Sequence, residues 1–221
     1  MTKNNTQLNI LMSAFLLLVS IGVVVLATVD IISYAVACLV LGVALIVPFF
    51  VLFERSHAKC KMLVLIATLS SIAIVGRWVF VWLPNVTLST GIVILAGVSL
   101  GAVPGFMVGA LTMLVSNMLV GQGLWTVWQM LMAGLIGLGA GLMRKADRLT
   151  LSVYAVLACF VYGFVMDIFT LVTVYNEITL ETFLVVWGAS FYFDLAHAVS
   201  SVVAVVMLYS AIVPPIRRRL E

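Results

Sequence analysis

NMLVGQGLWTVWQ, residues 117–129, joins two apolar segments of helical length through the short turn GQG. Glycines on both sides of one polar residue, placed between apolar runs, favour a turn, so the two segments are expected to form neighbouring helices. The stretch gathers polar and aromatic side chains in a chain that is otherwise apolar: Asn117, Gln122, Trp125, Trp128 and Gln129. The rest of the sequence places this cluster at the outer rim of a membrane bundle.

The composition is that of a polytopic membrane protein. Hydrophobic residues make up 65% and charged residues 9% of the 221 positions, whereas average soluble domains have about 25% charged residues. Apolar runs of about 20 residues recur, as membrane-spanning helices require, and the alternating pattern of a membrane β-barrel is missing. We predict an all-α bundle with eight apolar segments, at 9–29, 32–53, 62–83, 88–101, 105–120, 125–143, 151–174 and 182–211.

The fourth segment is short for a membrane span and is followed by GAVPG, residues 101–105. Glycine and proline interrupt helices, so 88–120 is expected to form a tight helical hairpin with a short first arm. Further glycines at helical spacing favour close approach of helix backbones: Gly105 with Gly109, and Gly134, Gly137 and Gly141.

Lysine and arginine set the orientation. Ten of the 11 lie in four segments that fall on one side of an eight-span bundle, namely the N-terminus, 54–61, 144–150 and the C-terminus. The connections on the other side carry none. The positive-inside rule therefore places both termini in the cytoplasm. Because topology accounts for these charges, the net charge of +3 gives no reason to expect nucleic acid as a partner.

The eleventh basic residue, Arg77, lies inside the third segment, where a charge costs roughly 2.5–3.5 kcal/mol at the centre of a spanning helix. The other strongly polar groups within segments are Asn117, Gln129, Asp167, Asp194 and His197. All are expected in the outer half of the membrane or near mid-depth. We interpret the charged members either as an ion-pair network between helices or as the lining of a pocket open to the outside.

The tryptophans map to the same outer side: Trp78, Trp82, Trp125, Trp128 and Trp187. Interfacial aromatic belts normally occur at both membrane faces, and here the inner face has no tryptophan. The pattern favours a pocket wall together with a partial belt, with a belt alone as the alternative.

Motifs for other activities are missing from the sequence. There is no GxxxxGK[ST] for a P-loop, no HExxH and no GxSxG. Asp194 and His197 could share a metal, but no second pair of ligands accompanies them, so no metal or cofactor is expected. An intramembrane enzyme using Asp167, Asp194 and His197 is one alternative, and a non-transporting membrane scaffold is another.

From Lys61 onward the chain resembles the substrate-binding S components of energy-coupling factor (ECF) transporters. The similarity begins with KMLVLIATLSSIAIVGR, continues through LPNVTLSTGIVILAGVSLGAVPGFMVGALTMLVSNMLVGQGLWTVWQMLMAGLIGLGAGL, and closes with YGFVMD and FDLAHA. A short helix, a Gly-Pro-Gly-like turn, a glycine-rich helix and a loop into the next helix are similar to the family pattern. The resemblance implies a six-helix substrate-binding domain at 61–221, preceded at 1–60 by an added transmembrane hairpin and cytoplasmic linker.

The resemblance also implies a division of labour. An S component in the cell membrane of a prokaryote captures a vitamin or related micronutrient, while a transmembrane coupling subunit and two cytoplasmic ATPase subunits supply the energy. Family members dock to the coupling subunit through small residues on the first core helix. The matching positions here are Ala67 and Ser71.

Together, the residues and the resemblance predict a solute site at the outer face, entered between the loops 83–89 and 121–125. The expected contact residues are Arg77, Trp78, Asn85, Asn117, Gln122, Trp125, Trp128, Gln129, Asp167, Asp194 and His197. A corrinoid is one solute that suits a mouth rich in tryptophan and amides. Other vitamins and a queuosine-like precursor stay open.

Overall fold

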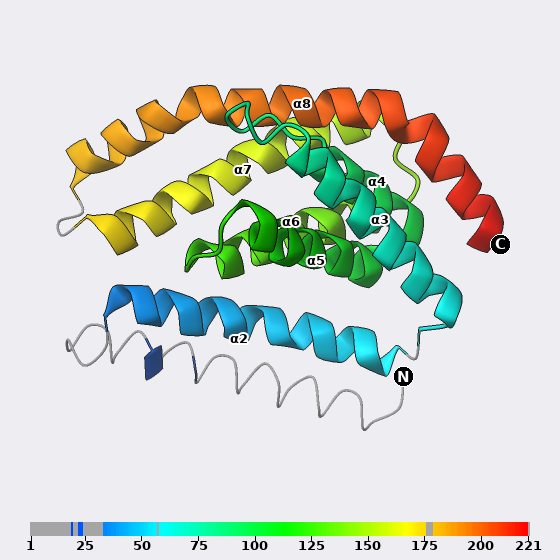
Figure 1. Cartoon of the computed structure of the whole chain (residues 1–221), viewed down its shortest axis with the longest axis horizontal. Helices are drawn as coiled ribbons and strands as arrows, with labels where there is room; N and C mark the ends of the chain where they lie inside the picture. Colours follow the sequence, from blue (N-terminus) through cyan, green and yellow to red (C-terminus); the bar gives the residue numbers. More distant parts are fainter. Residues whose placement is uncertain (1–18, 20–21, 24–32, 57, 176–178, 221) are drawn as a thin grey trace.

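The computed structural model describes residues 19, 22–23, 33–56, 58–175 and 179–220. Within these ranges the chain is helical (Figure 1), with α2 at Tyr34–Arg55, α3 at Cys60–Trp78, α4 at Ser89–Leu100, α5 at Ala102–Val120, α6 at Trp125–Leu142, α7 at Arg148–Val174 and α8 at Leu180–Leu220. All of these except α4 are long and apolar enough to cross a membrane. The predicted all-α polytopic bundle is confirmed. The first predicted segment, 9–29, lies almost entirely outside the described residues.

Two helix ends differ from the prediction by five residues or more. α3 ends at Trp78 rather than at 83, and residues 79–88 form a loop. Pro84 disfavours helical geometry at the residue before it, which agrees with the early end. α8 continues past 211 through Pro214 and Pro215 to Leu220. Tertiary packing offsets the two prolines there.

The packing of the α8 C-terminus is visible in its buried side chains. Val213 and Ile216, on either side of the proline pair, belong to two different clusters of the apolar core. The helix has 41 residues, which corresponds to about 61 Å at 1.5 Å per residue. This exceeds the roughly 30 Å hydrocarbon core of a bilayer, so α8 is strongly tilted or extends beyond the membrane at one or both ends.

α4 is the central helix of the bundle. Every one of its residues is buried, and it packs against α3, α5, α6, α7 and α8. A helix that is apolar on all sides belongs in the core of a bundle, and α4 carries no charged residue. α2 lies along the opposite side of α5 and α6 from α8 (Figure 1).

The hairpin of α4 and α5 turns at a single residue. Gly101 has φ +106°, a conformation that glycine adopts without steric cost. Pro104 does not interrupt a helix, because it lies in the first turn of α5, where the backbone N–H that proline lacks would have no helical partner. The predicted break is therefore confirmed, and it is confined to Gly101.

Glycines bring the backbones of α4, α5 and α6 together. A Cβ atom on Gly97 or on Gly105 would overlap the carbonyl oxygen of Gly137, and one on Gly137 would overlap the carbonyl oxygen of Gly105. Gly109 lies equally close to the backbone of Ala133. The predicted role of these glycines in helix packing is confirmed.

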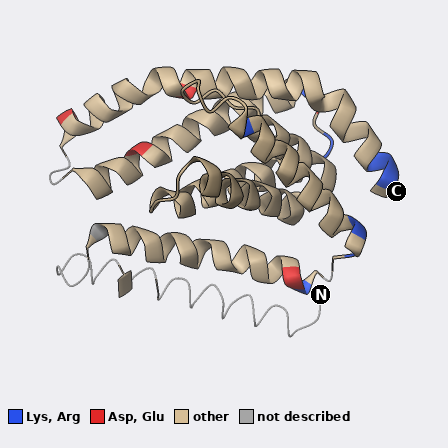
Figure 2. Ribbon diagram, viewed as in Figure 1, with Lys and Arg blue, Asp and Glu red and all other residues tan. Residues whose placement is uncertain are grey.

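Among the described residues, every Lys and Arg except Arg77 lies at one end of the bundle. Figure 2 shows Lys and Arg at the end that holds the α2 C-terminus, the α3 N-terminus, the α6–α7 connection and the α8 C-terminus; we call this the basic end. The positive-inside rule assigns it to the cytoplasm. Asp147 caps α7 there by accepting a hydrogen bond from the backbone N–H of Thr150 at 3.1 Å. Hydrogen bonds from Thr150 hold the pKa of Asp147 below its usual value.

Candidate functional site

Arg77, from the last turn of α3, is the centre of a polar cluster. Its Nη1 group donates to Ser116 Oγ at 2.5 Å and to Asn117 Oδ1 at 2.7 Å. Asn117 Nδ2 donates in turn to Thr126 Oγ1 at 2.9 Å and to Gln129 Oε1 at 2.8 Å. We call these five residues the Arg77 cluster. It joins α3, α5 and α6 through side chains that are buried or half-buried.

The partners of Arg77 are neutral. Within the described part of the chain, no carboxylate forms an ion pair with Arg77, and its Nε and Nη2 groups have no hydrogen-bond partner. A guanidinium has five N–H donors, and Nη1 supplies only two of them. Arg77 is thus positioned by α5 through one nitrogen, which also lies 3.4 Å from Met113 Sδ.

A hollow of about 530 Å³ lies next to this cluster, between the N-terminal turns of α2 and α6 and the C-terminal half of α7. This outer hollow is at the end of the bundle opposite the basic end. Trp125 and Gln129 line it from α6, Ala35 lines it from α2, and Met166 and Phe169 are among the α7 residues on its far side. Gln129 connects the two features, because it lines the hollow and also accepts the hydrogen bond from Asn117.

Asp167 and Asp194 form a separate pair between α7 and α8. Ser190 Oγ donates to Asp167 Oδ2 at 2.6 Å and lies 3.5 Å from Asp194 Oδ2. Both aspartates are buried, and Gly163 leaves the space that the Asp194 carboxylate occupies. Their described partner is therefore Ser190 rather than Arg77, and the ion-pair network that was one interpretation of these charges does not form among the described residues.

His197 lies in the core of the bundle. Its Nε2 atom is 2.7 Å from Thr90 Oγ1 on α4, and the ring of Tyr162 meets the imidazole edge-on at a centroid distance of 5.4 Å. His197 follows Asp194 by one helical turn, as predicted, but its own contacts join α8 to α4 and α7. No group of three or more His, Cys, Asp or Glu side chains in the described ranges is arranged to hold a metal ion.

The tryptophans have different surroundings. Trp128 donates from Nε1 to the backbone oxygen of Cys38 at 3.1 Å and so fastens α2 to α6. Trp125 lines the outer hollow, whereas Trp78, Trp82 and Trp187 are exposed at the surface, as side chains of a partial interfacial belt would be.

Of the two loops that were expected to frame the entrance, 121–125 borders the outer hollow through Leu124 and Trp125, whereas 83–89 contributes no lining residue. The loop 79–88 is held over α8 by a hydrogen bond from the Thr87 backbone N–H to Ser200 Oγ at 3.1 Å. Asn85, in that loop, is exposed and has φ +56°. Gln122 is also exposed and donates to the backbone oxygen of Leu114 at 3.2 Å. Neither side chain lines the hollow or touches the Arg77 cluster.

Several polar contacts involve residues that were not among the predicted site residues. Ser116, Thr126, Ser190 and Thr90 each hold a predicted site residue in place. Only Ser190 had a local signal, because it precedes Asp194 by four positions and so shares its helix face.

The small residues on α3 face outward. Ala67 and Ser71 are exposed, in a stripe that also exposes Val64, Thr68 and Val75. Within the described chain, no helix covers this stripe.

Comparison with known proteins gives one match. A family model described as "ECF-type riboflavin transporter, S component" matches residues 57–214, which spans α3 to most of α8 and leaves α2 outside. No curated protein matches the chain, and no solved structure matches it.

Proposed function

The chain belongs to the family of ECF-type riboflavin transporter S components, and from this premise we propose that it captures riboflavin or a closely similar solute in the outer hollow. The family makes it a substrate-specific subunit of a membrane transporter rather than an enzyme. The identity of the solute, the residues that contact it and the docking of partner subunits are proposed here in addition to the family assignment.

The observation that carries the proposal is that Gln129 lines an aromatic-walled hollow and is linked through Asn117 to Arg77, which does not itself line the hollow. Riboflavin has a flat tricyclic ring with two carbonyl acceptors and an N–H donor at one edge. Trp125 offers a flat apolar wall, Gln129 offers an amide, and the uncommitted donors of Arg77 suit carbonyl oxygens. The volume of about 530 Å³ falls within the range of small-molecule sites.

A corrinoid, suggested by the wall chemistry of the sequence, is the second candidate. Its macrocycle with amide side chains is much larger than a flavin ring, so it would need the hollow to widen by movement of α2 or α7. For this reason we place riboflavin first and keep the corrinoid as a direct competitor in the binding test.

The energy for uptake comes from other chains of the transporter. We propose that a transmembrane coupling subunit docks on the exposed α3 stripe at Ala67 and Ser71, with two cytoplasmic ATPase subunits bound to that coupling subunit. The exposure of this small-residue stripe supports close helix approach there.

The alternative of an intramembrane enzyme has less support. Asp167 and Asp194 are joined through Ser190, and His197 is engaged with Thr90. None of these three residues lines the outer hollow.

The test is equilibrium binding of riboflavin and of a corrinoid to the purified full chain. Riboflavin binding is measured by quenching of its fluorescence, and binding of both solutes is measured by calorimetry. Gln129→Ala is expected to weaken riboflavin binding roughly 5- to 10-fold, the effect of one neutral hydrogen bond. Gln122→Ala is the matched control and should leave binding unchanged. Tight corrinoid binding without riboflavin binding would reverse the order of the two solutes. If Gln129→Ala and Gln122→Ala weakened riboflavin binding equally, the binding site would be assigned to the α5–α6 loop rather than to the hollow.

A further inference from the structure

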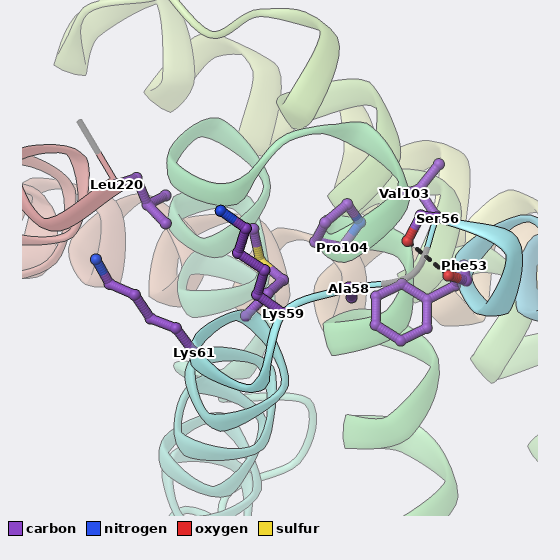
Figure 3. Close-up of a pocket in the computed structure, with 9 residues that line it drawn as sticks. Phe53, Ser56, Ala58, Lys59, Lys61, Val103, Pro104 and Leu220 are labelled. Atoms are coloured by element: carbon purple, nitrogen blue, oxygen red, sulfur yellow. Dashed lines mark hydrogen bonds between the residues drawn. The ribbon is translucent and has the colours of Figure 1, made fainter.

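A second hollow lies at the basic end of the bundle, far from the proposed solute site. It has a volume of about 460 Å³ and is enclosed by the C-terminal end of α2, the first turns of α3 and α5, and the last turn of α8. Figure 3 shows Lys59 and Lys61 extending along one side of it near Leu220, with Phe53 and Pro104 on the other side. We call it the lysine hollow.

The lysine hollow is amphipathic. Phe53, Met62, Pro104 and Leu220 give it apolar walls, while Lys59 and Lys61 bring two ammonium groups to its rim. Lysine commonly lays its apolar stem along such a wall and keeps its charged head at the polar boundary. A ligand that fills this hollow has to offer both a negative charge and an apolar part.

The two ammonium groups have no counter-ion among the described residues. Lys59 and Lys61 are exposed and make no ion pair within the described part of the chain. The carboxylates described at this end are Glu54 and Asp147, and Asp147 is engaged with Thr150. Among the described residues, the local charge is therefore positive and open to an anion from outside the chain.

Helix ends add to this positive charge. The first turns of α3 and α5 line the hollow, and neither helix has a side-chain hydrogen bond at its N-cap. Unsatisfied N–H groups give a helix N-terminus a partial positive charge that favours anions within about one turn. This contribution supports the lysines and would be insufficient without them.

A neighbouring hollow of about 280 Å³ is also basic, but one of its two guanidinium groups is held by the protein. It shares Leu220 and is lined by Ser99, Arg144 and Arg217. There the Arg217 guanidinium already donates to the backbone oxygens of Arg144 and Val98. Its charge is held by the protein, whereas Lys59 and Lys61 are free to move toward a ligand.

We propose that the lysine hollow binds an anionic phospholipid of the cytoplasmic leaflet, with the headgroup phosphate between Lys59 and Lys61 and the start of an acyl chain against Phe53 and Met62. The basic end lies at the cytoplasmic surface by the positive-inside rule, and basic hollows between helices on that side suit acidic headgroups. A free phosphate would bind the lysines but would make no contact with the apolar walls. A phospholipid can contact both, so it fits the hollow better. This inference does not depend on the identity of the transported solute.

The test is native mass spectrometry of the detergent-purified full chain titrated with phosphatidylglycerol, with phosphatidylcholine and inorganic phosphate as separate arms. A lysine near an anionic lipid contributes about fivefold in affinity, so Lys59→Gln with Lys61→Gln should weaken phosphatidylglycerol binding roughly 25-fold. The matched control is Lys145→Gln with Arg218→Gln. It removes the same charge from exposed residues of the basic end that line neither hollow, and it should keep most of the affinity.

A second variant tests the apolar half of the site. Ala58 lines the hollow, so Ala58→Trp should fill it and lower phosphatidylglycerol binding while both lysines remain. Circular dichroism and the unfolding temperature without lipid check that each variant is folded. Phosphatidylcholine binding as tight as phosphatidylglycerol, or equal losses in the two charge variants, would overturn the proposal. Phosphate that competes fully with the lipid at similar concentration, with Ala58→Trp unaffected, would reduce the hollow to a simple anion site.

Discussion

Arg77 shows how a charge inside the membrane is placed with neutral partners where the described residues offer no counter-ion. Nη1 is fixed by Ser116 and Asn117, and the remaining donors have no described partner. If those donors bind the solute, Arg77→Ala should lower riboflavin affinity about 10- to 100-fold, the effect of a hydrogen bond from a charged donor. Arg77→Lys keeps the charge but loses the planar guanidinium. Its riboflavin affinity is expected to lie between those of the wild-type chain and Arg77→Ala.

Fluorescence quenching by the purified chain measures this change, and Arg148→Ala is its control. The guanidinium of Arg148 donates to Ser210 and lies over the ring of Tyr209 at the basic end. A folded Arg77→Ala protein with unchanged affinity would leave Arg77 a purely structural role in joining α3 to α5.

The residues of the Arg77 cluster were predictable in part. Arg77, Asn117 and Gln129 each stand out as polar residues near one end of an apolar segment, and helix direction alone brings those ends together. Ser116 and Thr126 give no such signal, because small hydroxyl residues are common in membrane helices and their partners depend on the rotation of each helix. The same uncertainty in rotation left open whether Asp167 and Asp194 pair with Arg77 or line a pocket.

At the scale of elements, the contact of α4, α5 and α6 depends on glycines that leave no room for a side chain. Gly137→Ala should force these helices apart, because its Cβ would meet the backbone of Gly105. Overpacking of this kind costs about 1–3 kcal/mol and should lower the unfolding temperature in detergent. Gly188→Ala on α8 is the control, since its added Cβ would meet no atom from another part of the described structure within 4 Å. Equal unfolding temperatures for the two variants would contradict this packing.

α2 lies outside the family match yet supplies one wall of the outer hollow. It is fastened by the Trp128 hydrogen bond and by the stacked rings of Phe49 and Phe106, with centroids 3.9 Å apart. Ala35→Trp should fill the hollow and weaken riboflavin binding at least about tenfold. Val36→Trp, at an exposed neighbouring position, should not. Unimpaired binding in a folded Ala35→Trp protein would place the solute away from α2.

The sequence predicted which segments are helices more accurately than where they end. Hydrophobic length identified each described helix, including the short α4, and glycine with proline identified its turn. The continuation of α8 to Leu220 was missed because two consecutive prolines usually end a helix, and the burial of Val213 and Ile216 that offsets them depends on neighbours distant in sequence. The division into a hairpin at 1–60 and a domain at 61–221 stays a prediction.

At the scale of the whole molecule, the two ends of the bundle differ in charge and in the ligand proposed for each. The described Lys and Arg residues other than Arg77 lie at the basic end. The basic end holds the lysine hollow, and the opposite end holds the outer hollow and the Arg77 cluster. Both proposals therefore require one orientation in the membrane. The basic end has to face the cytoplasm for an anionic lipid of that leaflet, and the outer hollow has to face outward for uptake.

Cys60 allows this orientation to be measured without altering the charge pattern. It is the first residue of α3 at the basic end and is exposed, whereas Cys159 is buried and Cys38 is partly covered within α2. A membrane-impermeant maleimide should therefore leave Cys60 unlabelled in intact cells and label it in inverted vesicles. Leu83→Cys in a Cys60→Ser background, in the exposed loop at the other end of α3, should give the reverse pattern. Labelling of Cys60 from outside intact cells would show that the bundle has the opposite orientation in the membrane. It would then place the outer hollow in the cytoplasm, where it could not collect a solute for uptake, and the lysine hollow in the wrong leaflet.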